Sequence, residues 1–247
     1  MSNVEYNRGA IRPVECLKQG WELIKDQYWL FFGITFIGLL IGGAVPPGVL
    51  LGPILCGMYI CYFRKMKKEP ISFELLFKGF DFFAQGAITS VLQTLPGLIL
   101  WLVCYLPLIV IRVMSEMPSI ERGGRKPDPW FLFSTFGLEI VVIFLITFIS
   151  LAIKMFFTFS YPLIVERNMK AIEAIKTSFN AVLGNLRGMI GLLILQTLLG
   201  IVGLLACIIG LYFVLPIYYA SDAIAYRQVF PEDHAPINTP PPPPQSW

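Results

Sequence analysis

Charged residues are scarce in this sequence. Only 14% of its 247 residues are Asp, Glu, Lys or Arg, whereas 56% are hydrophobic and the mean hydropathy is +0.69. A soluble domain needs roughly a quarter charged residues to cover its surface. The composition therefore excludes an ordinary soluble domain and indicates an integral membrane protein.

The residues that usually build catalytic and metal sites are also few. The chain has a single histidine, His234, and five cysteines without a CxxC spacing, which argues against a structural zinc site or a disulfide framework. Within the apolar runs the only acids are Glu139 and Asp222, and no GxxxxGK loop is present. We therefore expect no enzyme, no metal and no cofactor, and no nucleic-acid partner.

What the sequence has instead is long apolar runs. They predict six transmembrane helices, in 28–45, 46–63, 86–111 and 131–165 and as two short spans within 189–226. As one helix, 131–165 would measure about 52 Å against roughly 30 Å of hydrocarbon. We expect it to be strongly tilted, broken or protruding.

Three amphipathic segments, 13–27, 69–85 and 166–188, separate these runs. In the first, Val14, Leu17, Trp21 and Ile24 share one face, which predicts a helix lying in the headgroup plane. The expected fold is thus an all-α integral membrane protein. Its parts are a cytoplasmic segment (1–27), a six-helix domain (28–230) and a proline-rich cytoplasmic tail (231–247).

The distribution of Lys and Arg predicts the orientation. With both termini inside, the cytoplasmic segments hold 14 basic residues and the outer loop 112–130 holds four. Basic residues concentrate on the cytoplasmic side of membrane proteins. We expect both termini in the cytoplasm.

An internal repeat organises the same segments. Residues 15–42 align without gaps to 173–200, and 53–64 align to 216–227 with Pro53 opposite Pro216. The middle third, 72–167, fits as a looser copy. The sequence thus predicts three pseudo-repeated units, each an amphipathic helix followed by a hairpin of two spans.

Three phrases of the sequence resemble a broad group of bacterial multipass membrane proteins. They are "RKMKKEPISFELLFKGFDFF", "IKMFFTFSYPLIVERNMKAIEAIKTSFNAVLGN" and "LPIYYASDAIAYR". The group includes the membrane domain fused to some glycerophosphodiester phosphodiesterases. In the middle phrase the matching positions are Lys154, Pro162, Ala174 to Lys176, Ser178, Gly184 and Asn185. The resemblance implies a bacterial inner-membrane protein of about six helices and supplies no reaction.

Lys154 is the least expected residue of the apolar runs. A charged group inside a span is costly and usually faces the bundle interior, where it pairs or serves a substrate path. Gln93, Gln196 and Glu139 are also polar, and Asp222 lies five residues before Arg227. Our hypothesis is that Lys154 pairs with Asp222 or binds carbonyl oxygens near Pro216, with transport as the alternative.

The tail contains five consecutive prolines, Pro240, Pro241, Pro242, Pro243 and Pro244, and ends at Trp247. Such a run favours polyproline II, which aromatic grooves of partner proteins bind. A disordered cytoplasmic tail explains the same composition equally well.

Two functions remain open on the sequence. The first is a non-enzymatic scaffold, accessory subunit or envelope-homeostasis factor that contacts membrane lipids and, through its tail, another protein. The second is a small transporter or lipid-handling protein that uses Lys154. A continuous polar cavity that reaches Lys154 from one side favours the second, and a close-packed interior favours the first.

Overall fold

The computed structural model describes residues 5–45, 48–121, 129–205 and 209–231. In these ranges the chain forms helices and no strand, so the predicted all-α class is confirmed for the described residues. The helices, in chain order, are α1 (Pro13–Ile24), η1 (Lys25–Gln27), α2 (Tyr28–Gly43), α3 (Leu51–Met66), η2 (Phe73–Phe82), α4 (Phe83–Leu100), η3 (Trp101–Tyr105), α5 (Leu106–Glu121), α6 (Pro129–Phe157), α7 (Ser160–Arg167), α8 (Ala171–Gly184), α9 (Leu186–Leu205) and α10 (Ile209–Val229).

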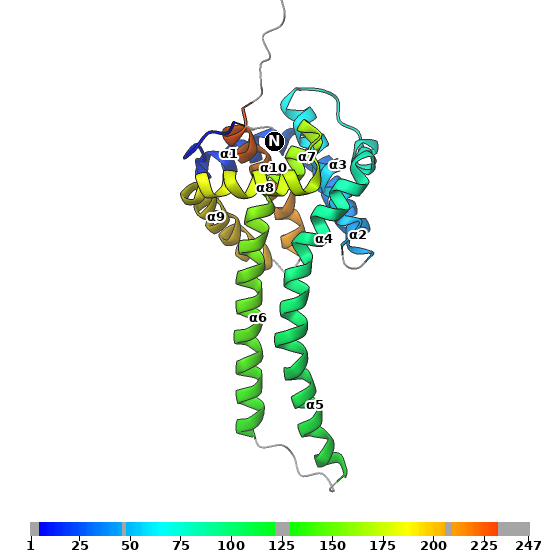
Figure 1. The fold of residues 1–247 in the computed structure, drawn as a ribbon, viewed down its shortest axis with the longest axis vertical. Helices are drawn as coiled ribbons and strands as arrows, with labels where there is room; N and C mark the ends of the chain where they lie inside the picture. Colours follow the sequence, from blue (N-terminus) through cyan, green and yellow to red (C-terminus); the bar gives the residue numbers. More distant parts are fainter. Residues whose placement is uncertain (1–4, 46–47, 122–128, 206–208, 232–247) are drawn as a thin grey trace, which may run out of the picture.

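The helices form a body from which one long hairpin projects (Figure 1). The hairpin consists of α4, η3 and α5 running out and α6 running back, whereas the shorter helices gather around its inner end. Apolar side chains of the hairpin are widely exposed, for example Trp130, Phe144 and Phe148. Only a hydrocarbon environment or another protein can cover such a surface at low cost.

Four stretches of the described chain are long and apolar enough to cross a membrane. They are Pro13–Gly43, Phe73–Met114, Phe136–Arg167 and Leu186–Leu205. The six spans and the threefold repeat stay predictions.

The long run 131–165 is broken. Helix α6 ends at Phe157, and α7 begins at Ser160. The hydroxyl of Ser178, on α8, donates to the carbonyl oxygen of Phe156 at 2.7 Å and accepts from the N–H of Phe159 at 3.2 Å. A helix break leaves buried backbone groups that need partners, and Ser178 supplies them on both sides.

Asn185 has a comparable role at the turn between α8 and α9. Its amide nitrogen donates to the carbonyl oxygens of Asn7 and Ala181, both at 2.9 Å, and its amide oxygen accepts from the N–H of Ala10 at 2.8 Å. One buried side chain thus joins the N-terminal segment to α8. The conformation of 5–12 therefore depends on a residue far away in the sequence.

Helix α3 is the most enclosed element of the body, because two glycines let η2 approach it. A Cβ atom on Gly57 would lie 1.9 Å from the carbonyl oxygen of Leu76, and one on Gly79 would lie 2.0 Å from that of Pro53. Only hydrogen fits in such a contact. The two elements therefore pack backbone to backbone, and α3 is buried almost along its whole length.

Helix α1 packs on the body through small residues. Its buried residues are Cys16, Gly20 and Ile24, and a Cβ atom on Gly20 would lie 2.8 Å from the backbone nitrogen of Ser221 in α10. Val14 and Trp21 are exposed. The small residues Cys16 and Gly20 therefore face α10, and the predicted helix is present. The position of α1 in the headgroup plane stays a prediction.

Candidate functional site

A cavity of about 140 Å³ lies in the body at the inner end of the hairpin. Residues of α3, α4, α7 and α10 and of the end of α6 line it. Its apolar wall includes Leu51, Leu55 and Phe157. Its polar lining consists of Tyr59, Gln93, Lys154, Thr158, Tyr161, Tyr219 and Asp222.

Lys154 enters this cavity from the last turn of α6. Its ammonium nitrogen lies 5.5 Å from the ring centroid of Tyr218 and 6.0 Å from that of Tyr219. At such distances the ring faces attract a cation. Lys154 donates no hydrogen bond to any residue within the described ranges, so the rings compensate only part of the lost hydration.

Asp222 supplies the opposite charge from α10. The residue is 4% exposed, and its Oδ1 accepts a hydrogen bond from Nε2 of Gln196, on α9, at 2.7 Å. Gln196 also donates to the hydroxyl of Ser221 at 2.9 Å. Asp222 Oδ2 accepts no hydrogen bond from the part of the chain that the structure describes.

The structure brings the two predicted residues into one site without a direct bond. Lys154 and Asp222 both line the cavity and also a second, much smaller hollow beside Gln196. No salt bridge within 4.0 Å joins them in the described structure. Within the described residues Lys154 makes no hydrogen bond to carbonyl oxygens near Pro216 either; the Pro216 carbonyl accepts from the hydroxyl of Tyr62 at 3.0 Å.

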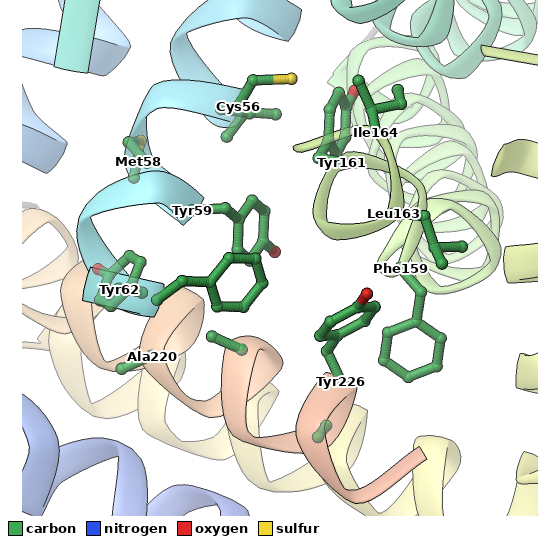
Figure 2. Close-up of a cluster of buried hydrophobic side chains, with 14 of the residues drawn as sticks. Cys56, Met58, Tyr59, Tyr62, Phe159, Tyr161, Leu163, Ile164, Ala220 and Tyr226 are labelled. Carbon is green, nitrogen blue, oxygen red and sulfur yellow. The ribbon is translucent and has the colours of Figure 1, made fainter. Parts of the chain in front are cut away.

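Tyrosines complete the site, and the sequence reasoning missed them. Figure 2 shows Tyr59 on α3 and Tyr161 on α7, two elements that face each other. The Tyr161 hydroxyl donates to Oε1 of Gln93 at 2.7 Å. Tyr59 is only 3% exposed, yet its hydroxyl has no hydrogen-bond partner among the described residues.

The predicted repeat contains a signal for one of these tyrosines. With Pro53 opposite Pro216, the residue opposite Asp222 is Tyr59. The two residues lie on α3 and α10 and line the same cavity. The alignment by itself did not single out Tyr59, because a tyrosine in an apolar span is commonly part of the packing.

The remaining charged residue of the apolar runs has a partner of its own. Glu139 pairs with Arg112 across the hairpin, with Nη1 and Oε1 3.3 Å apart. In the body, Arg227 pairs with Glu166 at 2.5 Å, and Lys65 pairs with Asp26 at 2.5 Å. These three pairs lie outside the cavity and explain charges that need no ligand.

The tail residues Pro240 to Pro244 and Trp247 lie outside the described residues. Within the described ranges no group of three or more His, Cys, Asp or Glu side chains is placed to hold a metal ion. Comparisons of the chain with protein-family models, curated proteins and solved structures found no match.

Proposed function

We propose that this protein binds a small polar ligand in the cavity at Lys154 and Asp222, as a small transporter or lipid-handling protein of the membrane does. The observation that carries the proposal is the cavity itself. It brings one ammonium, one carboxylate and several hydroxyls together inside an otherwise apolar body. Ionisable groups at such positions typically mark substrate paths.

The burial of these groups supports a binding role over a purely structural one. A structural ion pair inside a protein is in direct contact and saturates its hydrogen bonds. In this site Lys154 and Asp222 line a common space and make no direct salt bridge within the described structure. Unused donors and acceptors around a cavity are the features by which a binding site recognises a polar ligand.

The proposal includes the setting inferred from the sequence. We place the protein in the bacterial inner membrane as a multipass protein with six spans, in three repeated units, and with both termini in the cytoplasm. The resemblance to bacterial multipass proteins supports this setting, as does the Lys and Arg distribution. We propose binding without chemistry, since the apolar runs contain no catalytic pair.

The scaffold function has less support from the described residues. Its most specific element is the proline-rich tail, which lies outside them. The exposed apolar surface of the hairpin is compatible with a partner protein, but lipid explains it equally well. The cavity favours the ligand-binding function, because a scaffold has no use for one.

Cysteine labelling tests whether the cavity can take a ligand from water. In a cysteine-free variant of the full chain, Thr158→Cys places a thiol on the cavity wall, and Ala181→Cys places one at a fully buried position outside the cavity. We expect a small charged methanethiosulfonate reagent to modify the first variant at least tenfold faster. Equal rates would show that the cavity is closed to water and would overturn the proposed function.

A further inference from the structure

We infer that the ligand is a small zwitterion, with its carboxylate at Lys154 and its ammonium at Asp222. This inference rests on the proposed function and adds the chemical class of the ligand. It follows from three properties of the cavity, namely its charge, its unused hydrogen-bonding groups and its size.

The charges of the cavity wall sum to zero. Lys154 contributes one positive charge and Asp222 one negative charge, and the other polar lining groups are neutral hydroxyls and an amide. A net anion would be attracted by Lys154 but repelled by the nearby buried carboxylate of Asp222. A net cation would be attracted by Asp222 but repelled by Lys154. A ligand with both charges gains from both residues and brings no net charge into a low-dielectric site.

The unused hydrogen-bonding groups match the two ends of such a ligand. Asp222 Oδ2 is free to accept from an ammonium group, because the Gln196 amide is bonded to Oδ1. Lys154 can donate to a carboxylate, since it has no acceptor within the described ranges, and the Tyr59 hydroxyl is a further donor in the same cavity. The Tyr59 side chain is 3% exposed and lines the cavity, so that its hydroxyl is available to a ligand there.

The volume limits the size of the ligand. A cavity of about 140 Å³ is close to the roughly 150 Å³ that accommodates benzene in an engineered protein cavity. About six non-hydrogen atoms therefore fit. Glycine and β-alanine satisfy this limit and carry both charges, whereas a complete phospholipid headgroup with its glycerol does not fit.

Binding of matched probes to the full-length protein in detergent tests the inference. Glycine and β-alanine are the zwitterions, and acetate and methylammonium each carry one of the two charged groups. We expect a zwitterion to raise the thermal unfolding temperature, with an affinity at least tenfold higher than that of acetate or methylammonium. Equal or tighter binding of acetate or methylammonium would contradict the inference that the ligand is a zwitterion. The proposed binding of a ligand in the cavity would still stand.

Charge variants extend the test to the residues. Lys154→Met and Asp222→Asn should each weaken zwitterion binding about tenfold or more, because each removes a charged hydrogen bond. Asp222→Asn should now favour acetate, and Lys154→Met should favour methylammonium. Size-exclusion profiles like that of the wild type establish that each variant is folded. Unchanged zwitterion affinity in both variants contradicts the inference.

The outcomes of the two experiments are distinguishable. If no probe binds while Thr158→Cys is labelled rapidly, the zwitterion inference fails and the proposed cavity binding stands. If Thr158→Cys is as unreactive as Ala181→Cys, the proposed function fails, and the zwitterion inference fails with it.

Discussion

At the scale of single residues, the polar groups inside the apolar runs divide into those with direct partners and those without. Glu139 has Arg112, and Gln93 has Tyr161. Asp222 has Gln196, whereas Lys154 donates no hydrogen bond within the described residues; the two charges share a cavity, and the ammonium lies against aromatic rings. The ammonium and the carboxylate therefore interact by Coulomb attraction without a hydrogen bond, and this attraction is stronger the lower the dielectric constant around them.

This arrangement predicts a specific coupling between Lys154 and Asp222. Lys154→Met removes the positive charge nearest to a buried carboxylate, so we expect the free energy of unfolding to fall by about 1–3 kcal/mol. Adding Asp222→Asn should restore part of the loss, because no unpaired charge then remains. A double-mutant cycle, measured by denaturant unfolding of the purified protein, gives the coupling. Strictly additive effects would show that the two charges do not interact.

At the scale of elements, the break between α6 and α7 explains how an over-long apolar run is accommodated. The chain leaves the helix at Thr158 and Phe159, and the backbone groups around the break bond to Ser178 of α8. Lys154 in the last turn of α6, Thr158 in the break and Tyr161 at the start of α7 all line the cavity. Their i, i+4, i+7 spacing places them on one side of the chain, and the break ends α6 at this level of the body.

Ser178→Ala therefore tests the role of this break. The change leaves the Phe156 carbonyl and the Phe159 N–H without their partner. We therefore expect the free energy of unfolding to fall by about 1–3 kcal/mol. Asn180→Ala, at an exposed position of the same helix, is the control and should have an effect within about 0.5 kcal/mol. Thermal or denaturant unfolding compares the two. Similar effects of both changes would mean that Ser178 does not support the break.

At the scale of the whole molecule, the hairpin is longer than the other helices. From Phe83 to Glu121 the chain forms 39 consecutive helical residues, about 58 Å by the α-helical rise, whereas α2 and α3 have 16 each, about 24 Å. Of the four basic residues in 112–130, the predicted outer loop, Arg112 lies in α5, and the other three lie in the sequence 122–128 that joins α5 to α6. In the proposed topology, the end of the hairpin lies on the non-cytoplasmic side of the membrane.

Reporter fusions test the predicted orientation. Alkaline phosphatase inserted between Glu121 and Pro129 should be active, because this enzyme folds only outside the cytoplasm. The same insertion between Lys68 and Glu69 should be inactive, and green fluorescent protein fused after Phe230 should fluoresce. The reverse pattern would contradict the N-in, C-in topology and the argument from Lys and Arg.

The sequence by itself determined the class of protein, the helical content and the residues to examine. Hydropathy and helical period are local properties, and they identify apolar runs, amphipathic segments and an isolated lysine wherever these occur. The residue chemistry also indicated that Lys154 and Asp222 belong together, since a buried charge requires compensation.

Only the tertiary structure decided that the two charges line a cavity with Tyr59 instead of forming a direct pair, and that α1 packs on α10 through Cys16 and Gly20. These results depend on how closely elements approach. That approach is set by contacts such as Gly57 against Leu76 and Gly20 against Ser221, which join residues far apart in the sequence. A local pattern records which residues are small or apolar, but their partners are fixed only when the whole body packs.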